Sequence, residues 1–114
     1  MCEHNNDSNN QVYWVYMTVG DQAEAERIGA ALIDKRLAAC VNIIPGMTSL
    51  YRWEGRVERG TECVVVAKTR AGQWTALEQA VKQLHSYDCP CIVALPIADG
   101  HLPFLQWVVD ETAG

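Results

Sequence analysis

The chain has 114 residues, enough for one domain with a modest core. Its 14 acidic residues outnumber its 9 basic ones, giving a formal net charge of −5 with no basic run, which argues against nucleic acid and anionic membranes as main partners. No apolar stretch approaches the ~20 residues that a membrane-spanning helix needs, and residues 1–11 lack the apolar centre of a signal peptide. We therefore expect a soluble, cytoplasmic, single-domain protein.

Residues 1–11, rich in Asn, Asp and Ser, are expected to form a disordered tail ahead of one domain at 12–114. The β-branched and aromatic run 12–19 predicts a strand. A helix is predicted over 22–36, with Asp21 as its N-cap and Glu24 three residues later, as in a capping box. Its apolar residues recur at helical spacing: Ala25, Ile28, Ala31 and Leu32.

Residues 40–69 predict one long β-hairpin that turns at Glu54-Gly55. Pro45-Gly46 interrupts the first arm, which indicates an edge strand or a bulge. Each arm is far longer than the 5–6 residues usual for a strand. The outer half therefore overhangs its own core, and its free edges favour pairing with neighbouring copies in a closed ring. From this overhang we expect a homo-oligomer.

An amphipathic stripe predicts a second helix over 72–85, and an apolar run predicts a strand over 91–97. Pro103 suits the first turn of a short last helix. The resulting order, β-α-β-β-α-β plus a terminal helix, is the ferredoxin-like α+β sandwich, in which both helices cover one face of a four-stranded sheet. The expected core contains six apolar residues: Ile28, Leu32, Val65, Leu77, Val81 and Leu95.

No phosphate-binding glycine loop, nucleophile elbow or zinc-protease motif is present, so the sequence predicts no enzyme. Cys40 and His85 are the one nucleophile–base pair to consider. A small core residue is the simpler interpretation of Cys40, because it opens an apolar strand.

Soft metal ligands are densest at His85, Cys89 and Cys91, and the set suits Cu(I) or Zn(II), with Cys40 as a possible helper. The alternative is structural: His85 is a polar helix end and Cys91 only begins a strand. The five cysteines are odd in number and form no CxxC pair, which argues against a disulfide framework and a zinc ribbon.

Aromatic and charged residues crowd the hairpin turn. Tyr51 and Trp53 are either interface anchors or the lining of a cleft. Lys68 is either an anion ligand at a cleft or a solvated strand end, and Arg52 is the other cation that could serve such a cleft.

Two segments, 37–46 (LAACVNIIPG) and 48–55 (TSLYRWEG), resemble the central signature of the CutA divalent-cation tolerance family. Lys68-Thr69, His85 with Tyr87, and 94–97 (ALPI) agree with that family at their places, and the resemblance covers roughly 12–110. It implies a ferredoxin-like homotrimer similar to PII signalling proteins, and a link to tolerance of copper and other divalent metals.

The resemblance also implies a cleft between subunits near Cys40, Tyr51, Trp53, Lys68, His85 and Tyr87. The chain departs from the family at 85–88 (HSYD), where His-Pro-Tyr-Glu is usual, and at Pro90-Cys91, where Pro-Glu is usual. Extra cysteines of some bacterial members are replaced by Tyr16 and Ala80, so a copper site built on them does not carry over. Three functions stay open: metal tolerance with metal binding, a PII-like small-ligand sensor, and a trimeric scaffold.

Overall fold

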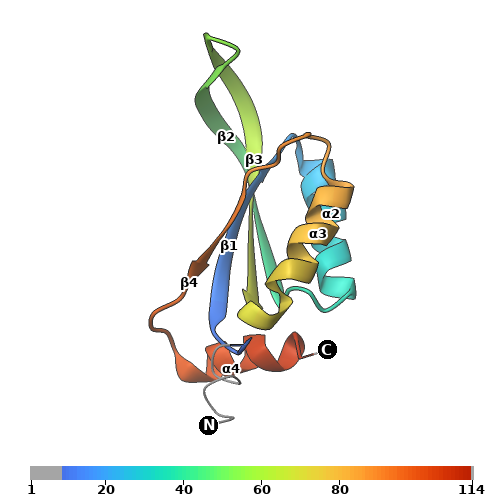
Figure 1. Ribbon diagram of the computed structural model, residues 1–114, viewed down its shortest axis with the longest axis vertical. Helices are drawn as coiled ribbons and strands as arrows, with labels where there is room; N and C mark the ends of the chain where they lie inside the picture. Colours follow the sequence, from blue (N-terminus) through green and yellow to red (C-terminus); the bar gives the residue numbers. More distant parts are fainter. Residues whose placement is uncertain (1–8, 114) are drawn as a thin grey trace.

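The computed structural model describes residues 9–113, and its four strands form one antiparallel sheet in the order β2-β3-β1-β4. Helices α2 and α3 cover one face of the sheet, while α4 lies across its lower end (Figure 1). The predicted order of elements is confirmed. The elements are β1 (Val12–Val19), α2 (Gln22–Asp34), β2 (Cys40–Trp53), β3 (Arg56–Arg70), α3 (Trp74–Leu84), β4 (Ile92–Pro96) and α4 (Leu102–Glu111).

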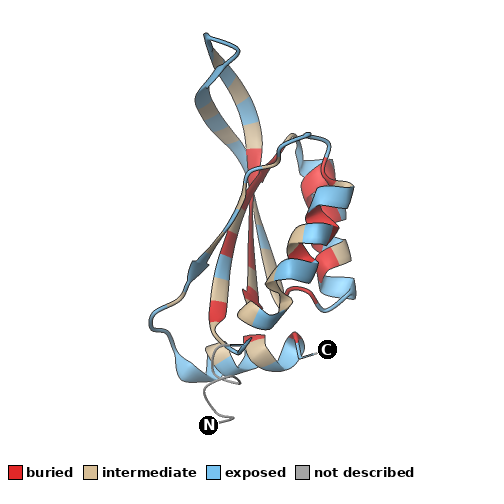
Figure 2. Cartoon of the chain, in the orientation of Figure 1, coloured by how far each residue is buried: buried red, intermediate tan, exposed pale blue. Residues whose placement is uncertain are grey.

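The core lies between the sheet and helices α2 and α3, as Figure 2 shows by the buried residues on those elements. Side chains alternate along each strand, so β1 sends Val15, Met17 and Val19 toward the helices. Five of the six predicted core residues are fully buried: Ile28, Leu32, Val65, Leu77 and Val81. Leu95 was predicted wrongly, because it is paired with Trp14 on the opposite face of the sheet and is 48% exposed.

Strands β2 and β3 form the predicted hairpin, with 14 and 15 residues. Its two-residue turn has positive φ at both Glu54 (49°) and Gly55 (79°), the backbone of a type I′ hairpin turn. The register shifts between Ile44 and Met47, which confirms the predicted irregularity at Pro45-Gly46. Strand β1 pairs with β3 only from Cys63 to Arg70, so the outer part of the hairpin extends beyond the sheet (Figure 1).

This extension makes the described part of the chain elongated, at 51 × 26 × 25 Å. Its radius of gyration is 15.2 Å, whereas a compact chain of this length has roughly 13 Å.

Helix α2 ends at Asp34, two residues earlier than predicted. Arg36 has a left-handed φ of 57°, and the Leu37 N–H donates to the Leu32 carbonyl at 2.9 Å. This is a Schellman motif, and the helical stripe could not reveal it because the left-handed residue is not glycine. The second predicted helix is divided into a 3₁₀ turn at Ala71–Gln73 and α3.

The face of the sheet opposite α2 and α3 has no covering layer in the described chain (Figure 1). Its exposed apolar side chains include Trp14, Val93 and Leu95, at 37%, 48% and 48% exposure. Helix α4 covers only one end of it, where Val12 and Val108 are buried. We call this surface the open face.

Of the expected tail, residues 1–8 lie outside the described residues, and Gln11 donates from its side-chain amide to the Ile97 carbonyl at 2.8 Å. Within residues 9–113, every helix is too short or too polar to cross a membrane.

Candidate functional site

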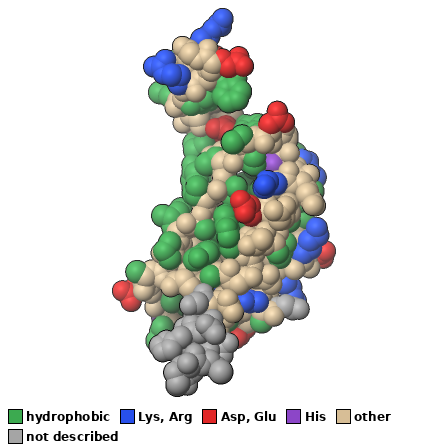
Figure 3. Space-filling view, in the orientation of Figure 1, with side chains coloured by type: hydrophobic (Ala, Val, Ile, Leu, Met, Phe, Trp, Pro, Cys, Tyr) green, Lys and Arg blue, Asp and Glu red, His purple; other side chains and the backbone are tan. Residues whose placement is uncertain are grey.

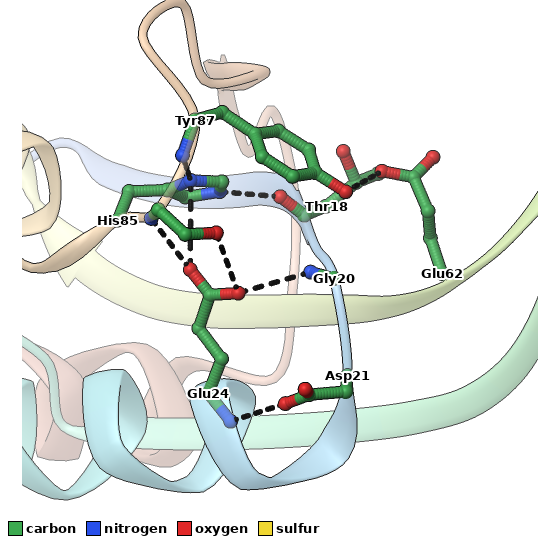
Figure 4. A network of polar contacts seen from close by, with 8 residues as sticks. Thr18, Gly20, Asp21, Glu24, Glu62, His85 and Tyr87 are labelled. Atoms are coloured by element: carbon green, nitrogen blue, oxygen red, sulfur yellow. Dashed lines mark hydrogen bonds and ion pairs between the residues drawn. The ribbon is translucent and has the colours of Figure 1, made fainter.

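The segment between α3 and β4, residues 85–91, passes the base of the hairpin and is anchored there by the His85 ring (Figure 4). The Nε2 atom lies 2.7 Å from the Thr18 carbonyl of β1, so Nε2 carries the proton and donates it. The Nδ1 atom accepts the Tyr87 N–H at 3.0 Å. Both ring nitrogens therefore have hydrogen-bond partners, and the side chain is fully buried.

A buried carboxylate completes this anchor. Glu24, in the first turn of α2, accepts from the Ser86 N–H at 2.8 Å, the Ser86 hydroxyl at 3.1 Å and the Gly20 N–H at 3.2 Å (Figure 4). Burial opposes its ionisation, but the bonds from Ser86 and Gly20, together with the nearby His85, outweigh burial and hold the pKa of Glu24 below its usual value. Glu24 thus ties α2 to the 85–91 segment as a carboxylate.

The predicted N-cap of α2 is confirmed, because the Asp21 carboxylate accepts the Glu24 N–H at 2.8 Å. The return bond of the capping box differs from the usual pattern. The Glu24 carboxylate accepts from Gly20 rather than from Asp21, because it also has to reach Ser86.

Tyr87 connects the segment to the hairpin. Its hydroxyl donates to Glu62 Oε2 at 3.0 Å, and the Ser49 hydroxyl donates to Glu62 Oε1 at 2.7 Å. The carboxylate of Glu62, on β3, is therefore bound by one donor from β2 and one from the 85–91 segment. Burial raises the pKa of Tyr87 to about 12, with further contributions from its hydrogen bond to Glu62 and from the charges of Glu62 and Glu24. Its hydroxyl therefore remains a donor at neutral pH.

These contacts form one side of a cavity of about 440 Å³ at the base of the hairpin. We call it the hairpin cleft. Its lining combines aromatic rings, carboxylates and thiols and includes neither Lys nor Arg: the residues are Thr18, Tyr51, Trp53, Glu62, Tyr87, Asp88, Cys89 and Cys91.

The cleft brings together part of the predicted site. Tyr51, Trp53 and Tyr87 all line it, whereas the cleft between subunits that the resemblance implies stays a prediction. Lys68 does not line it, because it lies six residues along β3 from Glu62, or roughly 20 Å at a rise of ~3.3 Å per residue. Within residues 9–113, no Lys or Arg therefore lines the cleft of a single chain to bind an anion.

Cys40 lies on the open face, at the start of edge strand β2. Its Sγ is 3.8 Å from Lys68 Nζ, which also donates to Asn42 Oδ1. The thiol is only half-buried and does not belong to the core, so the simpler interpretation of Cys40 as a core residue was wrong. The wrong face was assigned because an apolar strand gives no signal for which side faces the helices.

The four predicted metal ligands are not gathered in one place. Cys89 and Cys91 are exposed in the cleft, His85 is turned inward, and Cys40 starts the other edge strand. In the part of the chain that the structure describes, no group of three or more His, Cys, Asp or Glu side chains is placed to hold a metal ion. A metal site made of all four residues stays a prediction.

Several site residues were not found from the sequence: Thr18, Glu62, Ser86 and Asp88. The only signal for Glu62 is a single acid immediately before a buried apolar run, and Glu24 was recognised only as a capping residue. Their roles depend on the crossing of the 85–91 segment over the sheet, which periodicity does not describe.

The fold and the cleft define a class: a ferredoxin-like α+β domain with an overlong central hairpin and a cleft at its base. A family model described as "CutA1 divalent ion tolerance protein" matches residues 13–111, and the chain belongs to that family.

The chain is 46% identical over 98 residues to the divalent-cation tolerance protein CutA of Thermus thermophilus, covering 86% of this chain and 95% of the relative. The CutA protein of Archaeoglobus fulgidus is 46% identical over 99 residues, covering 87% and 95%. The solved structure of the divalent cation tolerance protein from Thermus thermophilus superposes with a TM-score of 0.87 at 44% identity, covering 89% of this chain and 98% of that one.

Proposed function

We propose that this chain acts in divalent-cation tolerance as a homotrimer and binds a soft metal ion, with Cu(I) the leading candidate, through Cys89 and Cys91. The names of the relatives support the link to divalent cations. The observation that carries the metal proposal is the presence of two exposed thiols, two residues apart, in one cleft.

The backbone supports the use of both thiols. Pro90 favours an extended Cys89, and alternate residues of an extended segment point to one side. The exposure pattern 91–95 alternates so that Cys91 shares the open side with Val93, while Ile92 packs against the core. Cys91 is therefore accessible rather than buried, and thiolate sulfur is the ligand that Cu(I) prefers.

The trimer proposal is supported by the open face and by the outer part of the hairpin, which extends beyond the sheet. Both expose apolar side chains and strand edges that nothing else in residues 9–113 covers. A neighbouring copy that pairs with the outer hairpin covers both, and cyclic symmetry closes the assembly.

A competition titration with Cu(I) and a chromogenic chelator tests the metal proposal. The double variant Cys89→Ser/Cys91→Ser is expected to lose more than roughly 100-fold in affinity, because loss of partners outside the first coordination sphere alone costs 10–100-fold. Cys40→Ser is the matched control and is expected to keep its affinity, since Cys40 lies on the other edge strand. Unchanged affinity in the double variant would refute a copper site at these thiols.

A further inference from the structure

A single residue of β1, Thr18, binds both ends of the segment 85–91. Its carbonyl accepts from His85 Nε2 at 2.7 Å, at the start of the segment (Figure 4). Its N–H donates to the Cys91 carbonyl at 3.3 Å, at the end of the segment. The stretch of backbone that carries Cys89 and Cys91 is therefore held at one point of the sheet by the protein itself.

The His85 side chain, which supplies the first of these two bonds, is fixed by its own surroundings. His85 caps α3, where its N–H donates to the Val81 carbonyl at 2.8 Å. The Tyr87 N–H donates to Nδ1 at 3.0 Å, and the Tyr87 ring packs on the imidazole with centroids 4.7 Å apart. The side chain is fully buried, so turning the ring toward a metal in the cleft would break both of its hydrogen bonds.

These bonds bear on whether His85 is a metal ligand. A metal-bound histidine often donates one N–H to a carbonyl and binds the metal through its other nitrogen. In this chain that other nitrogen is Nδ1, and its lone pair accepts the Tyr87 N–H. Ligation through Nδ1 would release Tyr87, and ligation through Nε2 would release Thr18. The geometry thus favours a role for His85 that leaves both bonds in place.

Holding the segment has a direct effect on a metal site formed by its thiols. Two thiols on a flexible loop lose conformational freedom when they converge on one ion, and this loss weakens binding. A loop whose two ends are already held loses less. Groups that orient the ligands of a metal without touching it typically change its affinity by 10–100-fold.

We propose that His85 is a positioning residue of the copper site and not one of its ligands. It holds the segment 85–91 on Thr18, so that the thiols of Cys89 and Cys91 are presented to the same ion. This inference rests on the proposed copper site at these two thiols. It differs from the sequence prediction, which counts His85 among the metal ligands.

Cu(I) competition titrations of the reduced, full-length protein test the role with two replacements of the ring. His85→Leu removes both hydrogen bonds and is expected to lose affinity by about 10- to 100-fold. His85→Gln has an amide N–H in place of the Nε2 donor, so it is expected to recover most of that loss. His101→Gln, at an exposed histidine that caps α4, is the control and is expected to bind as the wild type does.

X-ray absorption at the copper edge identifies the ligands directly. Wild type and His85→Gln are expected to give the same spectrum, dominated by sulfur neighbours. An imidazole contribution that is present in the wild type and absent from His85→Gln would overturn the proposal. Equal losses of affinity in His85→Gln and His85→Leu would overturn it as well, because both variants lack the imidazole and only one keeps the donor.

Hydrogen exchange of the metal-free protein tests the same bonds without copper. The amides of Thr18 and Tyr87 are expected to exchange faster in His85→Leu than in the wild type, and equal rates would contradict the proposal. Wild-type copper affinity in Cys89→Ser/Cys91→Ser would remove the copper site and the positioning role together. If that double variant loses copper while His85→Leu keeps wild-type affinity, only the positioning role is refuted.

Discussion

Glu24 is a carboxylate with only 5% of its surface exposed, at a point where three chain segments meet. Desolvation makes such a charge costly unless donors replace the lost water. Two N–H groups and one hydroxyl do so here, and the N-terminus of α2 adds a favourable dipole. The 85–91 segment therefore owes its position to a side chain of α2 that is distant in sequence.

Glu24→Ala is expected to destabilise the protein by about 2 kcal/mol, because it leaves the N–H groups of Gly20 and Ser86 without their acceptor. Glu26→Ala, on the exposed side of the same helix, is the control and is expected to cause no measurable change. Urea unfolding followed by circular dichroism at fixed protein concentration measures both variants. Equal midpoints for the two would show that the network contributes nothing to stability.

The same carboxylate predicts a pH dependence. The pKa of Glu24 is lower in the folded protein than in the unfolded chain, where it is about 4.5. Its contribution to the free energy of unfolding is therefore complete above pH 4.5 and is lost as the pH falls through the folded pKa. Glu24→Gln has no titrating group at this site. The stability difference between wild type and Glu24→Gln is therefore expected to shrink below pH 4.5, and thermal unfolding from pH 7 to pH 3 measures it.

The residues that line the hairpin cleft could be predicted only in part from the sequence. The crowding of aromatic residues at the hairpin turn led to Tyr51 and Trp53, the density of soft ligands led to Cys89 and Cys91, and the family resemblance added Tyr87; all five line the cleft. It did not lead to the use of both His85 nitrogens, because Thr18 lies 67 residues away along the chain. A contact of that separation depends on the sheet order.

At the scale of elements, the hairpin turn has the strictest backbone requirement. Gly55 has φ 79°, a left-handed conformation that a residue with a Cβ atom adopts only at a cost. The space around it is open, with no atom within 4 Å of the position that a Cβ would occupy, so a substitution there reports conformation alone.

Gly55→Ala is expected to destabilise the protein by about 1–2 kcal/mol, the cost of the left-handed region for an L-residue. Gly60→Ala on the same hairpin is the control: φ is not left-handed there, and an added Cβ atom meets only the Tyr51 hydroxyl at 3.8 Å. It is expected to be neutral or slightly stabilising. Thermal unfolding measures both, and equal losses would contradict the conformational explanation.

Element type and order were predictable because the stripes of α2 and α3 and the apolar runs of the strands have clear periods. Which side chains of β4 face the helices was not predictable, because its sequence at 92–96 (IVALP) is apolar at every position. Alternation gives no direction in such a strand, so Leu95 was assigned to the core while Ile92 and Ala94 pack there instead. An element that is apolar on both sides indicates that both sides are covered, but not by what.

At the scale of the whole molecule, the open face is the side of the sheet that no helix within residues 9–113 covers, apart from α4 at one end. Figure 3 shows hydrophobic side chains gathered along the side of the body that carries β4, continuing toward the hairpin. Exposed side chains there and on the hairpin include Leu50, Val57, Val93 and Leu95. A contiguous exposed apolar surface of this kind is typical of a protein–protein interface, and we expect its partner to be another copy of the chain.

Leu95→Lys is expected to convert the proposed trimer into monomers at micromolar concentration. Leu95 is half-exposed on the open face and outside the core, so the fold of each chain should survive. Burial of a leucine contributes roughly 1.5–3 kcal/mol. In a cyclic assembly the variant loses that contribution, and gains a buried charge, at every interface.

Ile33→Lys, with similar exposure (44%) but on α2, is the control and is expected to remain trimeric. Sedimentation velocity measures both. A trimeric Leu95→Lys would remove the open face from the interface, and a monomeric wild type would refute the assembly itself.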